Sequence, residues 1–102
     1  MIPKKKIEDL IKKHIALEKD LSSVEIDKKL FAEKSKEYSD LNEIIGIAKN
    51  YISLNKNISE LKKILDDNNT DDELKKMAEL ELSELKTEHE KNEKKLKLFL
   101  LP

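Results

Sequence analysis

The side chains best suited to chemistry in this chain are two histidines, His14 and His89, and a large set of carboxylates. His89 lies in the stretch TEHEKNE, whose mixture of imidazole and acids suggests a zinc site. Metalloprotease helices carry two histidines four residues apart, however, and His89 has no such partner. A charged, solvated helix face therefore explains this stretch better than a metal centre does.

Other catalytic groupings are missing from the sequence as well. Carboxylate pairs such as Glu79 and Glu81 are ordinary on a surface helix, and a single glycine, Gly46, leaves no glycine-rich phosphate loop. His14 falls on an apolar stripe, where a buried or edge histidine is a plainer interpretation than a ligand. We therefore predict a protein that is not an enzyme and has no catalytic, cofactor-binding or metal-binding residues.

The composition points to one fold class. The 102 residues are enough for one small domain, with 42% charged and 37% hydrophobic residues, one glycine and two prolines. Antiparallel sheets need turn residues every few positions, whereas the abundant Leu, Ile, Lys and Glu favour helices that are solvated on one side. The composition predicts an all-α fold.

The charge balance argues against several classes of partner. Twenty-one basic residues, all of them lysine, oppose 22 acidic residues, so the net charge is −1 and no basic field covers the surface. The lack of arginine weakens a nucleic-acid interpretation, although codon bias in an AT-rich genome explains it more simply. No segment is apolar enough for a signal peptide or a membrane span, and the absence of cysteine fits the cytosol. The sequence predicts a cytoplasmic protein with no membrane partner.

Apolar residues at helical spacing predict three helices, at about 4–21, 25–66 and 71–100. Pro3 stands where the start of a helix tolerates it. At 1.5 Å per residue, the second helix would span on the order of 60 Å.

Polar residues between these segments predict the helix starts. Ser22 with Glu25, or Ser23 alone, could cap the second helix. Thr70 and Glu73 have the spacing of a capping box for the third helix.

The second helix carries apolar residues over a wide arc. One stripe consists of Leu30, Lys34, Tyr38, Leu41, Ile45, Ala48 and Ile52, and another of Ile44, Ile47, Tyr51, Leu54, Ile58, Leu61 and Leu65. Where the stripes overlap, the helix should contact more than one neighbour. Gly46 lies inside this overlap, where it weakens the helix and either allows the close approach of a neighbour or marks a slight bend.

The turn DDNNTDDE predicts an antiparallel hairpin of the second and third helices. Folding the chain about Asn68 and Asn69 pairs Leu54 with Leu82, Tyr51 with Leu85, Ile47 with His89 and Leu41 with Leu96. The first turn similarly places Leu17 near Leu30 and Leu10 near Glu37. The predicted architecture is a three-helix bundle, with the shorter N-terminal helix packed at the base of the hairpin and a projecting two-helix arm.

The apolar end of the chain, KLKLFLLP, fits this architecture as the last turns of a docked helix. The first helix is expected to cover the late half of the third, so that Leu96, Phe99 and Leu100 are shielded. His89 and Asn92 interrupt the apolar stripe and are interpreted as register-setting or edge polar groups. Whether two copies pair their arms through the heptad stripe stays open.

Three stretches carry a resemblance to a known family. FAEKSKEYSDLNEII, residues 31–45, is similar to a family segment with an aromatic residue, a Ser-Lys/Arg-Glu-Tyr core and a following Leu. DDELKKMAELELSELK, residues 71–86, is similar to that family's third-helix opening, and LKLFLLP, residues 96–102, to its exit from the domain. Together these stretches resemble the N-terminal domain of the bacterial peptide chain release factor 1 family, class I factors for UAA and UAG.

This resemblance implies a domain of a translation termination factor, cut at an interdomain hinge at Pro102. The codon-reading Pro-x-Thr tripeptide and the catalytic Gly-Gly-Gln loop of the family are absent, so this chain neither reads codons nor releases peptides by itself. The implied partners are the ribosome, at the stalk base of the large subunit, and the GTPase release factor that recycles the parent protein. The expected ribosome-contacting residues form the arm tip: Asp66, Asp67, Asn68, Asn69, Asp71 and Asp72.

Two other classes of function compete with this interpretation. The heptads of the second helix are also typical of a stand-alone structural coiled coil or tethering module. An interfacial membrane helix would depend on KLKLFLLP alone, which is too short for a stable anchor.

Overall fold

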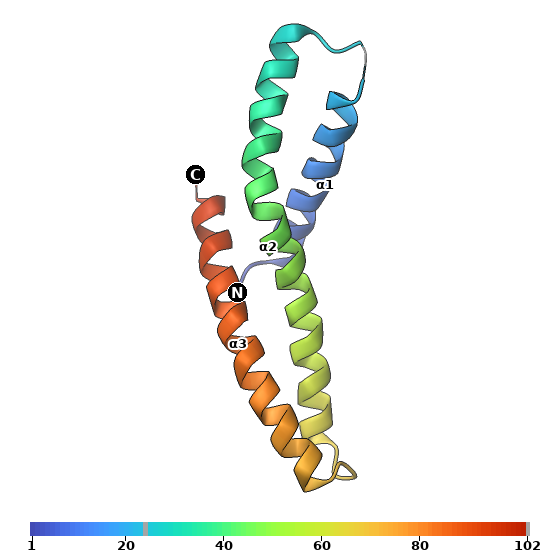
Figure 1. Ribbon diagram of the computed structural model, residues 1–102, viewed down its shortest axis with the longest axis vertical. Helices are drawn as coiled ribbons and strands as arrows, with labels where there is room; N and C mark the ends of the chain where they lie inside the picture. The colour runs from blue at the N-terminus through green and yellow to red at the C-terminus, as the bar shows by residue number, and fades with distance from the viewer. Residues whose placement is uncertain (24, 102) are drawn as a thin grey trace.

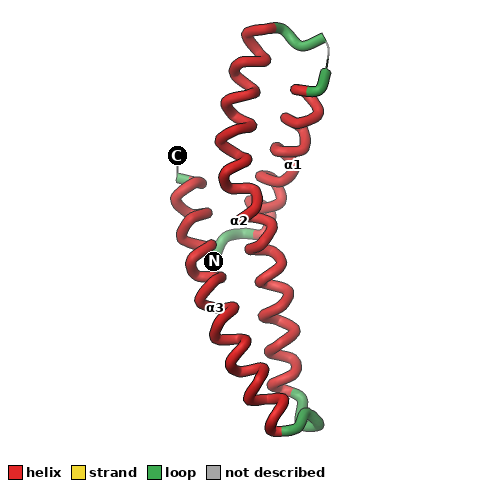
Figure 2. Tube along the Cα trace, in the orientation of Figure 1, coloured by secondary structure: helices red, strands yellow, loops and turns green. Residues whose placement is uncertain are grey.

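The computed structural model describes residues 1–23 and 25–101, which form three helices joined by two short loops (Figures 1 and 2). The helices are α1 (Lys4–Leu21), α2 (Lys28–Asp66) and α3 (Asp72–Leu100). There is no strand in these residues, and the all-α prediction is confirmed. The molecule is elongated, 62 × 25 × 18 Å, because α2 runs along its whole length.

Helix α2 is the central element, and α1 and α3 pack on different sides of it (Figure 1). Among the described residues, no Cα atom of α1 lies within 8 Å of a Cα atom of α3. The first helix was expected to cover the late half of the third, but the two helices meet only through side chains. Leu96 and Leu100 of α3 reach the same apolar cluster as Ile7 and Leu10 of α1.

The position of α2 between two neighbours explains its wide apolar arc. Its buried residues come from both predicted stripes: Leu41, Ile44, Ile45, Ala48, Tyr51, Leu54 and Leu61. The prediction that this helix contacts more than one neighbour is confirmed. The main core gathers where all three helices come near one another, and consists of Ile2, Ile7, Leu10, Leu17, Leu41, Ile44, Ala48, Tyr51 and Leu96.

The register of the α2–α3 hairpin differs from the predicted one by about one helical turn. His89 stacks on Tyr51 and bonds Asn55, whereas it was expected opposite Ile47. An apolar stripe repeats every three or four residues, so a shift of one turn again pairs apolar with apolar positions. The backbone of the turn sets the axial offset between the helices, and the pattern of apolar residues does not encode it.

The register of α1 on α2 is shifted further, by between one and two turns. The ring of His14 stacks on Tyr38, and Asp20 of α1 pairs with Lys34 of α2, whereas Leu17 was expected beside Leu30. The cause is the start of α2, which lies at Lys28 instead of residue 25, so the connection is longer than predicted.

Neither predicted N-terminal cap forms as expected. Asp27 is the N-cap of α2 and makes no side-chain capping bond, while the Ser22 hydroxyl donates to the carbonyl of Glu18 at the end of α1. At α3 the cap is Asp71, whose carboxylate accepts the backbone N–H of Leu74 at 2.8 Å. The Thr70 capping box was therefore placed one residue too early.

The end of α3 is covered only in part. Leu96 is fully buried and Leu100 half-buried, as expected, but Phe99 is 37% exposed and Leu98 is 70% exposed. Helix α1 packs on a different side of α2 from α3, so it leaves the outer side of α3 uncovered (Figure 1). Pro102, the expected hinge, lies outside the described residues.

Across the described residues, no helix combines the length and the apolar character that crossing a membrane requires.

Gly46 lies in open space on α2: apart from its chain neighbours and the nearby backbone of its own helix, no atom lies within 4 Å of the position that a Cβ would take. The idea that it admits a close neighbour is therefore wrong. Because its φ is not positive and nothing would clash, Gly46→Ala should stabilise the chain by about 1 kcal/mol. Thermal unfolding followed by circular dichroism would then show a midpoint higher by about 4–8 °C.

A matched control is available at Ala32, an exposed position of the same helix. Ala32→Gly should lower the midpoint by a similar amount, since it introduces the same backbone freedom that Gly46→Ala removes. An unchanged or lowered midpoint for Gly46→Ala would show that the glycine has a role that the local geometry does not reveal.

Candidate functional site

The tip of the arm is a compact turn organised by Asp67. Its carboxylate accepts the N–H of Asn69 at 2.9 Å, and its carbonyl accepts the N–H of Thr70 at 3.2 Å. Asp71 then caps α3, so the turn directs the chain from one helix into the next. Asp and Asn favour this geometry because their side chains bond nearby backbone N–H groups.

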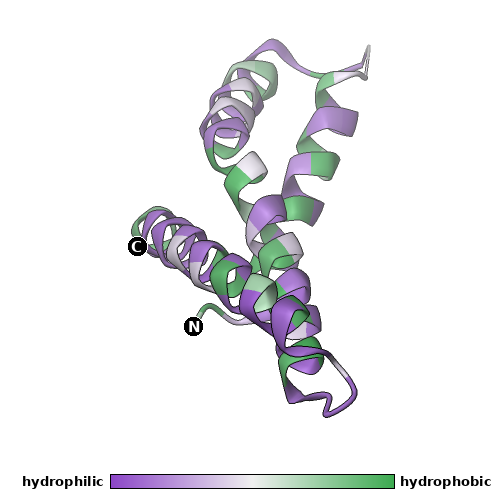
Figure 3. Ribbon diagram, turned by 60° about the horizontal axis from the view of Figure 1, so that its bottom comes forward, coloured by the Kyte–Doolittle hydropathy of each residue, from purple (hydrophilic) through white to green (hydrophobic). Residues whose placement is uncertain are grey.

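The structure brings all six predicted tip residues together at one end of the molecule. They are exposed side chains on a single turn: Asp66, Asp67, Asn68, Asn69, Asp71 and Asp72. In Figure 3 this loop has the colour of the hydrophilic end of the scale. Four carboxylates in one turn give the tip a strongly negative surface, and those at the start of α3 are stabilised by the positive end of its dipole.

An apolar ridge beside this turn was missed by the sequence interpretation. Leu74, Met77 and Leu80 of α3 are all exposed, Met77 and Leu80 by about two-thirds of their surface (65% and 67%). The signal that could have identified this ridge is the spacing of Leu74, Met77 and Leu80 at every third residue, which sets them apart from the buried Ala78.

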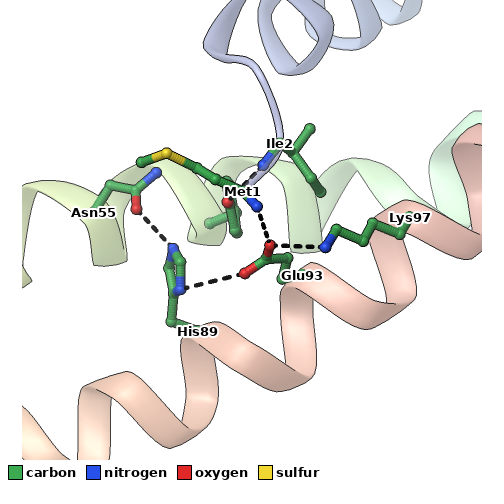
Figure 4. Close-up of polar contacts among 7 residues, drawn as sticks. Met1, Ile2, Asn55, His89, Glu93 and Lys97 are labelled. Atoms are coloured by element: carbon green, nitrogen blue, oxygen red, sulfur yellow. Dashed lines mark hydrogen bonds and ion pairs between the residues drawn. The ribbon is translucent and has the colours of Figure 1, made fainter.

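A second polar cluster lies where α3 crosses the middle of α2 (Figure 4). The ring of His89 stacks on Tyr51 with centroids 4.5 Å apart and planes inclined by 19°. Its Nε2 lies 2.6 Å from Oδ1 of Asn55, so this nitrogen carries the proton and donates. An imidazole held in this way positions α3, which agrees with its interpretation as a register-setting group.

Glu93 joins this cluster to the start of the chain. Its carboxylate lies 2.8 Å from the amino group of Met1 and 3.1 Å from Nζ of Lys97, and its side chain is 18% exposed. The hydrogen bond from the amino terminus, and next the one from Lys97, lower the pKa of Glu93 below its ordinary value of 4.5. The first residues of the chain are thereby attached to α3.

The lowered pKa of Glu93 predicts a pH-dependent contribution to stability. A carboxylate whose folded pKa is depressed stabilises the fold above its ordinary pKa of 4.5 and loses that contribution as the pH falls below it. Glu93→Gln should therefore cost up to about 1 kcal/mol at pH 7 and almost nothing near pH 3.

Urea unfolding at pH 7, 5, 4 and 3 measures this difference. Glu90→Gln, at an exposed position on the same helix, is the control and should change little at any of these values. An equal loss for Glu93→Gln at pH 7 and pH 3 would show that the ion pairs do not contribute.

A similar arrangement holds α1. The ring of His14 stacks on Tyr38 at 4.8 Å, and its Nε2 lies 2.8 Å from Oδ1 of Asn42. In both clusters a histidine from a flanking helix meets a Tyr-x-x-x-Asn pair on α2. The repeat of this pair at residues 38–42 and 51–55 is the sequence signal that could have revealed them. His14 is buried, which confirms its structural interpretation.

Within residues 1–23 and 25–101, no group of three or more His, Asp or Glu side chains is placed to hold a metal ion. The molecule presents an acidic turn with an adjoining apolar ridge, carried at the far end of a long arm.

Comparison with known proteins identifies the class. Residues 10–102 match the PCRF domain, and the chain belongs to this family. Over all 102 residues it is 66% identical to Peptide chain release factor 1 of Pelagibacter ubique (strain HTCC1062), and it spans 29% of that relative's length. The resemblance predicted from the three sequence stretches is confirmed. No solved structure matches the chain.

Proposed function

We propose that this chain serves as a domain of a cytoplasmic translation termination factor that directs peptide release at UAA and UAG codons. The observation that carries the proposal is the 66% identity to a relative named Peptide chain release factor 1. Reading of the stop codon and hydrolysis then belong to other parts of such a factor. This domain acts through the contacts that it makes and has no catalysis of its own.

The shape of the arm suits this role. The acidic turn lies at one end of a molecule 62 Å long, while α1 and the end of α3 lie toward the other (Figure 1). We infer that the tip contacts the stalk base of the large ribosomal subunit and so affects recycling of the factor by its GTPase. Carboxylates repel RNA phosphates, so the tip favours lysine- or arginine-bearing protein surface within that region.

The test reverses charge at the tip without disturbing the turn. Asp67 and Asp71 accept the backbone bonds and are left intact, and Asp66→Lys with Asp72→Lys is introduced into the full-length factor. We expect the association rate with stop-codon ribosomes to fall by about tenfold at low salt, while peptide release by bound factor is unchanged. Turnover with the recycling GTPase should slow in parallel.

The control makes the same change of net charge elsewhere. Glu33 and Asp40 are exposed on the opposite end of α2, so Glu33→Lys with Asp40→Lys should leave the association rate near that of the unmodified factor. If both double variants slow association equally, only net charge matters and the tip is not the contact. An unchanged rate for the tip variant would refute the proposal outright.

The alternative of a stand-alone tethering coiled coil has less support. Its main argument was the heptad stripe on α2, and most of that stripe packs inside the chain: Ile44, Tyr51, Leu54 and Leu61 are buried. Those four side chains are not available for contact with a second copy. A role as a tether alone also does not explain why the chain is 66% identical to a release factor over its full length.

A further inference from the structure

A groove of about 920 Å³ runs along the arm on a face of α2 that α3 does not line. Its floor is the stretch of α2 from Tyr51 to Lys62, and one end is closed by residues 1–4 and Ile7. The lining side chains of α2 are Tyr51, Ile52, Asn55, Lys56, Ile58, Ser59 and Lys62. This groove belongs neither to the arm tip nor to the core.

The charged side chains that line the groove are all of one sign. Three lysines, Lys4, Lys56 and Lys62, line it, and no carboxylate does, although acidic residues outnumber basic ones in the chain. Among the described residues, no carboxylate oxygen lies within 4.0 Å of Nζ of Lys56 or Lys62. Nζ of Lys4 lies 3.8 Å from Glu8 and remains largely exposed. The groove therefore combines apolar surface with unneutralised positive charge.

Helix α1 shows how another part of α2 is covered. It packs apolar residues such as Leu10 and Leu17 against α2, and its Asp20 pairs with Lys34 of α2. Beyond the start of α1, α2 continues for several turns with α3 as its neighbour and without a third helix. Ile52 and Ile58 are half-buried in this part of α2. Lys56 and Lys62 line the same groove, so carboxylates that flank a bound apolar segment would lie near them.

We propose that this groove is a docking site for an amphipathic helix with acidic flanks, carried by another protein. The apolar side of such a helix would cover Ile52 and Ile58, and its carboxylates would meet Lys56 and Lys62, as Asp20 meets Lys34. RNA fits less well, because the groove has no arginine and the ring of Tyr51, 1% exposed, is not available for base stacking.

This site is independent of the proposed contact at the arm tip. The tip is acidic and would attract basic surface, whereas the groove would attract acidic surface. One molecule of the parent factor could hold both partners at once, since the groove and the turn lie on different stretches of the arm.

The first experiment uses the ¹⁵N-labelled chain and two synthetic helical peptides of about 16 residues. Both peptides carry leucines at helical spacing, one flanked by Glu and the other by Lys, and single-stranded oligo(U) RNA is the third probe. We expect saturable amide shifts confined to the groove, around Ile52 to Lys62, with the acidic peptide alone. Its dissociation constant should rise with salt.

Variants of the chain sharpen this test. Lys56→Glu with Lys62→Glu should weaken binding of the acidic peptide by about tenfold or more. The matched control is Lys28→Glu with Lys29→Glu at the other end of α2, which should bind as the original does. Ser59→Trp, at an exposed position lining the groove, should block binding without touching the core.

Several outcomes would overturn the proposal. They are equal binding of both peptides, shifts centred on the arm tip, stronger binding of the RNA, and no binding of the acidic peptide. Circular dichroism of each variant ensures that a loss of binding is not a loss of fold. A tip variant that binds the peptide normally separates this result from the proposed ribosomal contact.

Discussion

Tyr51→Ala is expected to lower the free energy of unfolding by about 3–5 kcal/mol, the largest single loss in the chain. Tyr51 is only 1% exposed, and its ring lies in the core and against His89. Its hydroxyl oxygen also accepts the N–H of Ile2 at 3.3 Å. Removing the side chain leaves a cavity and takes away the stacking partner of the His89 ring. It also removes the hydrogen bond that holds Ile2 to α2. Urea unfolding followed by circular dichroism measures the loss.

Two further variants separate the parts of this effect. Tyr51→Phe keeps the stacked ring and loses only the hydroxyl bond, so it should cost about 1 kcal/mol. Tyr38→Ala removes the half-buried equivalent beside His14 and should cost less than Tyr51→Ala, with increased amide exchange confined to α1. Similar losses for Tyr51→Ala and Tyr51→Phe would mean that the ring itself contributes little.

Leu96→Ala should cost about 2–5 kcal/mol, because Leu96 is the fully buried side chain through which α3 enters the main core. The backbones of α1 and α3 do not meet, so the three helices depend on a few such side chains for their common core. We expect faster amide exchange in the last turns of α3 and in α1, while the arm near the tip stays protected.

Leu98→Ala is the matched control for Leu96→Ala. Leu98 lies two residues away on the same helix and is 70% exposed, so its removal should change stability by no more than about 0.5 kcal/mol. If the two variants were equally stable, the end of α3 would not be packed on the core. If exchange rose only in α3 after Leu96→Ala, α1 would be held by α2 alone.

The helices themselves were predictable, since they depend on local information. The first helix spans Lys4–Leu21, the range expected from its apolar spacing, and α2 and α3 begin within a few residues of the expected positions. The acidic turn was also predictable, because Asp and Asn at residues 66–72 favour turns wherever they occur. The N-cap of α3 was predicted at Thr70 and lies at Asp71. Such errors arose because adjacent polar residues are equally suitable as N-caps, so the sequence does not choose between them.

The details of the site were not predictable in the same way. Nothing in a single segment indicates that His89 stacks on Tyr51, since the two residues are 38 positions apart and meet only when the hairpin closes. The exposure of Met77 likewise depends on which side of α3 faces α2, and the groove beside Lys56 depends on where α1 begins.

The sequence by itself determined three helices, a polar turn between the second and third, and the family to which the chain belongs. These follow from periodicity, turn chemistry and residue identity, each of which acts over a few positions. Only the tertiary structure decided the register of α1 and α3 on α2, and with it the two histidine clusters and the lysine-lined groove. The physical reason is that apolar stripes repeat every three or four residues, so several registers bury similar area, and the loop geometry and a few specific contacts such as His89 with Asn55 select one of them.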